Sequence, residues 1–314
     1  MALPAALQRR LKLPVICAPM FRVSGPELVI AACRAGVIGA FPTANCRTPA
    51  ELGEWLTRIG AALGPDDAPF CPNLIVRHEG LSEQLQQLVR HRIELVITSV
   101  GSPASVVAPL HDIGCLVFAD VASLRHAHKA VQAGADGLVL LSAGAGGQTG
   151  WVNGFAFARA VRQFFDGPIV MAGGMADGHA VWAARALGCD LAYMGTAFIA
   201  THESRAEPAY KQMLVDAEFD DVMLSDAFTG LPTNMLRPSI VASGLDPAAL
   251  PAGLGAEAAA MLYGSGDAAP RRWKDIWSAG HSVSGVRSVV SADYRVVQTL
   301  AEYEEARAAS NALN

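Results

Sequence analysis

The sequence predicts an α/β protein: a (β/α)8 TIM barrel with a smaller, mostly helical lid subdomain inserted near the C-terminus. Eight short apolar runs, bounded by turn residues and separated by helical patterns, predict the barrel strands. The runs are continuous rather than alternating, as in parallel strands that are covered on both faces. They begin at Val15, Val37, Phe70, Leu95, Cys115, Gly137, Ile169 and Leu191. Their number and even spacing favour a closed barrel over an open doubly wound sheet, which stays the alternative.

Helix-start signals separate these runs. Thr48 precedes Pro49 and stands three positions before Glu51, which is the spacing of a capping box. Ser24 precedes a Gly-Pro pair and is predicted to cap the first long helix. Both signals support helices that alternate with the apolar runs.

The pattern changes after Thr201. Residues 203–217 look helical, and no strand-like pattern follows them. Prolines then punctuate an Ala/Gly-rich region, at Pro232, Pro238, Pro247, Pro251 and Pro270. We therefore predict a barrel over 1–214, a helical lid over 215–280 and a C-terminal segment over 281–314. A helix near 293–309 in that last segment is expected to return to the barrel wall.

The composition narrows the classes of function. Hydrophobic residues make up 52% of the 314 residues and charged residues 17%, which argues against disorder. A net charge of −5 suggests no nucleic-acid partner, and no apolar stretch approaches the ~18 residues of a membrane helix. The six cysteines show no C-x-x-C spacing, which predicts a reducing, cytoplasmic location. His126 and His128 lie two apart, so no metal site is predicted.

Glycine-rich turns follow the last two predicted barrel strands, where barrels often bind a phosphate. The seventh strand leads into Ala172–Gly178 and the eighth into Met194–Thr196. Glycines let backbone N–H groups approach a phosphate, and a helix start adds a partial positive charge. Phosphate binding is favoured over ordinary turn chemistry. A third glycine-rich loop, Ser142–Trp151, is predicted to lie against a ligand rather than to be a flexible connector.

Several motifs occur in a fixed order along the chain. They are APM at 18–20, Asn73 in PNL, AGGQTG at 145–150, AGGMADG at 172–178, MGT at 194–196 and WSAG at 277–280. Together they resemble the nitronate monooxygenase (2-nitropropane dioxygenase-like) family of FMN-dependent TIM-barrel oxidoreductases. That family also includes NAD(P)H:quinone reductases and flavin-type enoyl-thioester reductases. The resemblance covers nearly the whole chain.

The resemblance implies non-covalent FMN and a set of residues that hold it. These cofactor-binding residues are Ala18, Pro19, Met20, Asn73, Gly146, Gly147, Gln148, Gly173, Gly174, Gly195 and Thr196. The residues from Ala18 to Asn73 in this list would contact the isoalloxazine ring. The residues from Gly173 to Thr196 would hold the phosphate. The glycines of the third loop would line the face of the ring that meets the substrate.

Two positions depart from the family pattern, and they are the predicted catalytic residues. Gln148 stands where the family usually has a histidine that acts as general base or proton donor. Glutamine can orient a substrate, but it accepts no proton near neutral pH. Asp120 stands at the end of the fifth strand, where some relatives have a lysine. It is expected either to face the substrate or to cap the following helix, 123–131.

The expected function is oxidation of an alkyl nitronate, or a similar electron-rich carbon substrate, by O2 with FMN as cofactor. The alternative enzyme is an NAD(P)H-dependent quinone or enoyl-thioester reductase. A non-catalytic flavin-binding protein is the second alternative, because Gln148 replaces the family's histidine. The partner is a small molecule in either enzyme. The sequence fixes neither the physiological substrate nor the oligomeric state, and a homodimer remains open.

Overall fold

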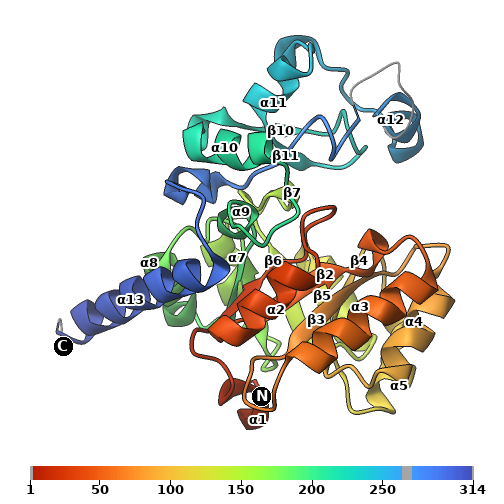
Figure 1. Cartoon of the computed structure of the whole chain (residues 1–314), viewed down its shortest axis with the longest axis vertical. Helices are drawn as coiled ribbons and strands as arrows, with labels where there is room; N and C mark the ends of the chain where they lie inside the picture. Colours follow the sequence, from red (N-terminus) through yellow and green to blue (C-terminus); the bar gives the residue numbers. More distant parts are fainter. Residues whose placement is uncertain (1–2, 264–270, 313–314) are drawn as a thin grey trace.

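The computed structural model of the chain describes residues 3–263 and 271–312. Its eight parallel strands close into a barrel, because β1 pairs with β9 as well as with β2 (Figure 1). The predicted TIM barrel is confirmed, and the open sheet is wrong. The barrel strands are β1 (Val15–Cys17), β2 (Ile38–Pro42), β3 (Phe70–Ile75), β4 (Leu95–Ser99), β5 (Leu116–Val121), β6 (Gly137–Leu141), β8 (Ile169–Ala172) and β9 (Leu191–Met194).

The strands are apolar on both faces because both faces are buried. Phe118 of β5 points into the barrel lumen with residues of the other strands, such as Ile16 and Ile97. Its neighbours Val117 and Ala119 pack under the surrounding helices. Side chains alternate between the faces of a strand, so burial of both faces removes the polar alternation of a half-exposed strand.

Helices cover the outside of the barrel. They are α2 (Pro26–Ala35), α3 (Pro49–Ala62), α4 (Leu81–Arg90), α5 (Ala104–His111), α6 (Leu124–Gln132), α7 (Gly154–Val161) and α8 (Gly178–Ala186). The short α1 (Ala5–Gln8) packs Leu7 against the lumen residues, and the short α9 (Thr196–Ile199) follows β9 at its carboxyl end. Thr48 caps α3 as predicted, accepting the Glu51 N–H at 3.1 Å. The predicted Ser24 cap is wrong, because Gly25 is the N-cap of α2. The Ser24 hydroxyl instead accepts the Met20 N–H at 3.0 Å.

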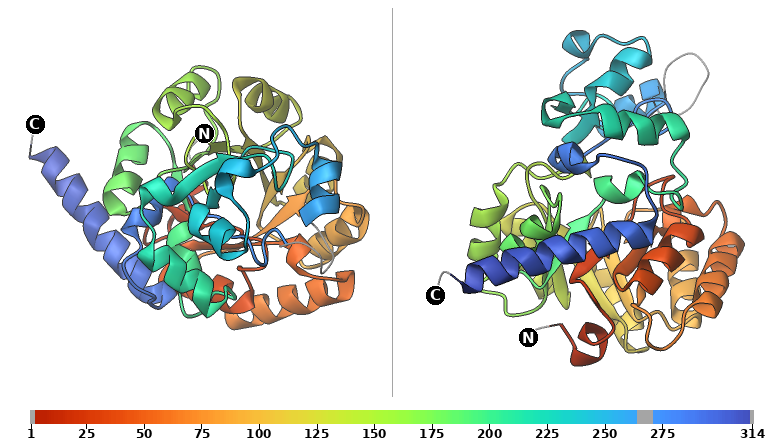
Figure 2. Two further views of the ribbon diagram at one scale, coloured as in Figure 1. Left: turned by 90° about the horizontal axis from the view of Figure 1, so that it is seen from above. Right: turned by 60° about the vertical axis from the view of Figure 1, so that its left-hand side comes forward.

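A second layer lies over the carboxyl ends of the barrel strands (Figures 1 and 2). It contains α10 (Pro208–Asp216), β10 (Val222–Ser225), β11 (Thr233–Leu236), α11 (Arg237–Ala242) and α12 (Ala256–Tyr263). The expectation of no strand after Thr201 is wrong, because β10 and β11 form an antiparallel sheet with β7 (Gly147–Gln148). These strands are short, and β11 buries two polar side chains, Thr233 and Asn234, so no apolar run reveals it. The boundaries 215 and 280 of a separate lid stay a proposal.

The last helix, α13 (Ala292–Asn311), packs on the outer wall of the barrel against α8 and α2 (Figure 2, right). Gly178 at the start of α8 permits this contact. A Cβ atom there would collide with the backbone of Thr299 and Tyr303 in α13. No helix among the described residues has the length and apolarity that crossing a membrane requires.

We predict that Gly178→Ala destabilises the fold by about 1–3 kcal/mol, since the added methyl group must displace backbone rather than a flexible side chain. The control is Gly60→Ala in α3, where an added Cβ meets no atom within 4 Å. That change should stabilise the protein by up to ~1 kcal/mol through helix propensity. Urea unfolding measures both. Equal effects of the two substitutions would show that α13 does not press on Gly178.

Candidate active site

A cavity of about 710 Å³ opens between the carboxyl ends of the barrel strands and the second layer. Every predicted cofactor-binding and catalytic residue lines this cavity, although these residues come from six separate segments. They are Ala18, Pro19, Met20, Asn73, Asp120, Gly146, Gly147, Gln148, Gly173, Gly174, Gly195 and Thr196. Their roles in binding and catalysis stay predictions, but their assembly in one place is a feature of the fold.

The floor of the cavity is the last ring of side chains inside the barrel. Each floor residue stands two positions after a residue that fills the lumen, so the two point the same way. The floor consists of Asn73, Ser99, Asp120, Leu141 and Tyr193. Asn73 is bound within the protein, because its amide donates to the Ser99 hydroxyl at 3.2 Å and to the Ile97 carbonyl at 3.3 Å. It therefore reaches the cavity with little donor capacity to spare.

Two polar atoms of the floor have no partner among the described residues: Asp120 Oδ1 and the Tyr193 hydroxyl, both buried. Burial raises the pKa of Asp120 from the ordinary 3.8 to about 7. Burial, and then the charge of Asp120, raise the pKa of Tyr193 well above its usual value, so its phenol stays neutral. The helix-cap interpretation of Asp120 is wrong, since Ser123 caps α6 by accepting the His126 N–H at 3.2 Å.

Tyr193 is a site residue that the sequence analysis missed. It lies inside the apolar run of β9, where it looks like an ordinary strand aromatic. The available signal was its position two residues after the buried Leu191, at the carboxyl end of the strand. A polar aromatic at that place faces the cavity rather than the helices.

The glycine turns after β8 and β9 form a cradle of free backbone donors. Gly173 has φ +111° and Gly174 has φ +73°, which side chains rarely adopt, and a Cβ at Gly174 would point into open space. No hydrogen bond is recorded from the N–H groups of Gly173, Gly174, Gly195 or Thr196 to the described part of the chain. The α8 helix begins directly after this turn, with Asp177 as its N-cap. The cradle fits a phosphate group.

Hydrogen bonds from Asn45 hold the loop that follows β1. Asn45 donates to the carbonyls of Met20 and Ser24 at 3.1 and 2.8 Å. The side-chain oxygen Oδ1 of Asn45 accepts the backbone N–H of Arg22 at 2.8 Å, and Arg22 has a φ of +62°. These bonds set the backbone of Ala18–Met20 along one wall of the cavity.

The third glycine-rich loop is attached to the second layer. In β7, Gln148 pairs with Thr233 and Gly147 pairs with Asn234 of β11. The buried Asn234 side chain also donates to the Ala145 carbonyl at 2.8 Å. The Gln148 side chain is exposed at the cavity wall and is recorded in no hydrogen bond with the described residues. Its backbone is therefore fixed, while its amide is available to a ligand.

Four cations line the same cavity: Arg22, Arg205, Arg272 and Lys274, which we call the cationic collar. Within the described ranges, none of them has a carboxylate partner closer than 4.0 Å. Arg272 donates to the Phe228 carbonyl at 2.9 Å, and burial lowers its pKa. Two carboxyl groups, those of Asp120 and Glu207, line the same cavity, so its four cations outnumber its acidic side chains on a chain whose net charge is −5.

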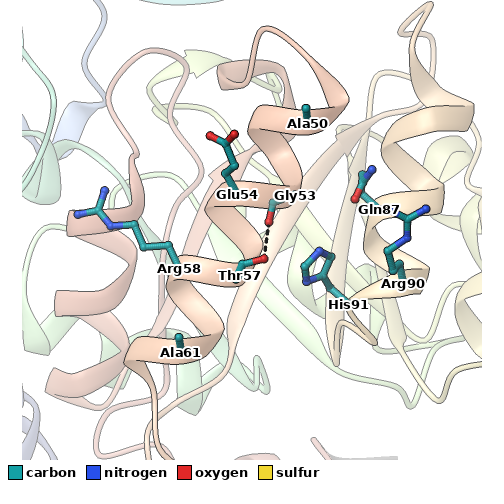
Figure 3. A pocket seen from close by; sticks show the side chains of 9 residues that line it. All are labelled: Ala50, Gly53, Glu54, Thr57, Arg58, Ala61, Gln87, Arg90 and His91. Carbon is teal, nitrogen blue, oxygen red and sulfur yellow. Dashed lines mark hydrogen bonds between the residues drawn. The ribbon is translucent and has the colours of Figure 1, made fainter.

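A second depression lies on the outer wall, between α3 and α4 (Figure 3). Small or short side chains of α3 face Gln87 and His91 across it. The Thr57 hydroxyl is bonded to the Gly53 carbonyl at 2.8 Å. This groove contains none of the predicted site residues and lies away from the carboxyl ends of the strands, so it is not the candidate site.

A closed parallel barrel with a ligand cavity over the carboxyl ends of its strands is the architecture of the (β/α)8 barrel enzymes. The family model described as nitronate monooxygenase matches residues 78–292. The chain therefore belongs to the nitronate monooxygenase family, which is a family of flavin-dependent oxidoreductases.

Individual relatives carry different names. The chain is 27% identical over 231 residues to the (3aS,4S,5R,7aS)-5-hydroxy-7a-methyl-1-oxo-octahydro-1H-indene-4-carboxyl-CoA dehydrogenase of Mycobacterium tuberculosis, covering 73% of this chain and 64% of that protein. It is 25% identical over 278 residues to the nitronate monooxygenase of Paraburkholderia phytofirmans, and the match covers 74% of this chain and 76% of that protein. The solved nitroalkane oxidase from Streptomyces ansochromogenes superposes with a TM-score of 0.80 at 28% identity. The superposition covers 97% of this chain and 99% of that one.

We predict that Asn234→Ala loosens the third glycine-rich loop. The substitution leaves the buried Ala145 carbonyl without its donor, which costs about 1–3 kcal/mol. Amide hydrogen exchange should accelerate across residues 144–150. The control is Ser243→Ala, which removes a hydrogen bond to Ile240 in the same layer without touching the loop. Unchanged exchange in the Asn234 variant would mean that the β7–β11 pairing alone holds the loop.

Proposed function

We propose that the protein is an FMN-dependent oxidoreductase that oxidises an alkyl nitronate, or a similar electron-rich carbon substrate, with O2. One observation supports this most strongly: a single cavity is lined by all the predicted cofactor-binding and catalytic residues, with free backbone donors at the predicted phosphate position. Bound FMN would take electrons from the substrate and pass them to O2. FMN is preferred over FAD because the described residues form one such cradle, and because the sequence has no G-x-G-x-x-G fingerprint after the first strand.

The residues of this chain have separate tasks in the proposed reaction. The backbone N–H groups of Gly173 and Gly174 would bind the phosphate with charge-assisted hydrogen bonds. The braced segment Ala18–Met20 would supply a flat wall for the flavin ring. The Gln148 amide would donate to an oxygen of the substrate, which orients it without moving a proton. A nitronate anion has already lost its proton, so this set suffices for it.

The location and the partners follow from the same proposal. All six cysteines are free and buried. Burial raises the pKa of Cys33 to about 12 and that of Cys189 to about 11, so these thiols behave as small apolar side chains. We propose a cytoplasmic enzyme with a small-molecule substrate and O2 or NAD(P)H as co-substrate. A homodimer stays a prediction.

The test measures which flavin the protein binds and how tightly the glycine cradle holds it. We expect the purified protein to be yellow and to release FMN, rather than FAD, on heating. Gly174→Val should weaken FMN binding about 10- to 100-fold, because a side chain in the cradle costs one charge-assisted hydrogen bond of ~1.5–3 kcal/mol. The matched control is Gly114→Val: that glycine has φ +78°, has equally open space around its Cβ and lies outside the cavity.

Fluorescence titration of the flavin-free protein gives the FMN dissociation constants. Equal weakening in both glycine variants would reflect backbone strain rather than a lost phosphate contact. Release of FAD would refute the choice of cofactor. A flavin that neither a nitronate nor NAD(P)H reduces would favour the non-catalytic flavin-binding protein.

A second candidate is a reductase or dehydrogenase that acts on a coenzyme A thioester. The cationic collar favours it, because four cations without carboxylate partners in the described chain exceed what a small nitronate needs. Their charge complements the phosphate groups of coenzyme A. The first relative reported above is also named as a carboxyl-CoA dehydrogenase. Oxidation or reduction of the acyl chain would use the same flavin and the same cavity floor.

We predict that Arg272→Gln weakens binding of coenzyme A to the FMN-loaded protein by about tenfold or more, since it removes a charge-assisted contact. Arg271→Gln is the matched control, because Arg271 is paired with Asp275 and does not line the cavity. Perturbation of the flavin absorbance by coenzyme A, measured at two salt concentrations, reports the binding. If the enzyme is a nitronate oxidase, coenzyme A should not bind saturably to either variant or to the wild type.

A further inference from the structure

The cavity floor contains two polar groups that the proposed function leaves unused. Asp120 stands on β5 and Tyr193 on β9, and each has a buried oxygen without a partner in the described chain. The other two polar residues of the floor, Asn73 and Ser99, are hydrogen-bonded to each other. A buried, unsatisfied carboxyl oxygen costs stability. Such groups persist where they meet a ligand rather than the protein.

We propose that Asp120 is the proton-transfer group of this site and that the Tyr193 hydroxyl positions the reacting group beside it. This inference rests on the proposed function and deepens it. It assigns to the barrel floor the task that the family's histidine performs from the loop at position 148. The substrate class widens accordingly, from pre-formed nitronates to neutral nitroalkanes with an acidic hydrogen on the carbon next to the nitro group.

The proton-transfer step needs no oxidant. The Asp120 carboxylate takes the hydrogen from the carbon next to the nitro group, so that a C–H bond breaks and an O–H bond forms on the carboxyl. The electron pair of the C–H bond moves onto the nitro group and gives the nitronate. The Gln148 amide then donates to the nitronate oxygens, which hold the new charge. Asp120 is left as the neutral acid.

The surroundings of Asp120 suit this exchange near neutral pH. Tyr193 of β9 and Cys71 of β3 are the titratable side chains that interact with it across the lumen. Both are neutral, because burial raises their pKa values. The adjacent strands β4 and β6 place Ser99 and Leu141 at the floor, and neither titrates. Since burial alone raises the pKa of Asp120 to about 7, both the acid and the base form are present at neutral pH.

The sign of the pH effect on stability follows from the raised pKa. The unfolded carboxyl releases its proton near 3.8, whereas the folded carboxyl holds it up to about 7. The wild type therefore loses stability relative to Asp120→Asn as the pH rises through this window, and the difference is constant above it. In the flavin-free protein, the melting-temperature gap between the two should open between these pH values. A gap that does not change with pH would mean that the pKa of Asp120 lies in its ordinary range, and this would overturn the proposal.

The decisive experiment follows exchange of the α-hydrogens of nitroethane with D2O by NMR, without O2, in flavin-free and FMN-loaded protein. We expect the wild type to catalyse the exchange and Asp120→Asn to lower it roughly 10²–10⁴-fold, the range of general-base catalysis. Tyr193→Phe should lower it less and shift the midpoint of its pH profile, which a merely structural hydroxyl would not do. Tyr294→Phe is the matched control, because Tyr294 is exposed on α13 and does not line the cavity; it should keep both the rate and the profile.

The same variants separate this proposal from the proposed function. Anaerobic flavin reduction by pre-formed nitronate should survive in Asp120→Asn, whereas reduction by neutral nitroethane should be lost. Exchange without flavin reduction in the wild type would refute the oxidase and leave the proton-transfer role standing. Absence of exchange in the wild type, or equal loss of both nitroethane forms in Asp120→Asn, would overturn the role of Asp120.

Discussion

The cavity depends on the contact between the loop after β6 and strand β11. The barrel alone would leave eight strand ends open to solvent. Pairing of Gly147 with Asn234, and the Asn234 bond to the Ala145 carbonyl, join the second layer to the barrel. The WSAG segment completes the junction, since the Gly280 N–H donates to the Thr196 hydroxyl at 2.9 Å. Three loops thereby share one hydrogen-bonded seam at the edge of the cavity.

The polar residues of the cavity floor lower the stability of the fold. Apolar side chains fill the barrel lumen up to Phe118. The next ring outward introduces Asp120 and Tyr193, whose Oδ1 and hydroxyl have no hydrogen-bond partner in the part of the chain that the structure describes. A hydrophobic pair at those positions would pack against the lumen with no desolvation penalty. Burial raises the pKa of the Asp120 carboxyl to about 7, and perturbed pKa values of this kind cluster at functional sites.

The sequence predicted the elements that have a strong local signal. All eight barrel strands coincide with the apolar runs, because burial on both faces leaves a continuous pattern. The site residues also converged in one cavity, since barrel topology brings all carboxyl strand ends together. Residues whose role comes from distant contacts were missed. Asn45 and Asn234 carry no motif, and their value lies in the carbonyls that the fold brings to them.

Gln148 carries no titratable group, whereas the floor of the same cavity has the Asp120 carboxyl. The cavity thus combines an acid, a neutral amide and the cationic collar. The collar favours a ligand that carries negative charge. A volume of about 710 Å³ lies within the usual range for ligand sites, ~300–1,000 Å³, and FMN itself would fill much of it. Under the proposed function FMN and the substrate share this volume, so the size and charge of the substrate distinguish a nitronate from a thioester.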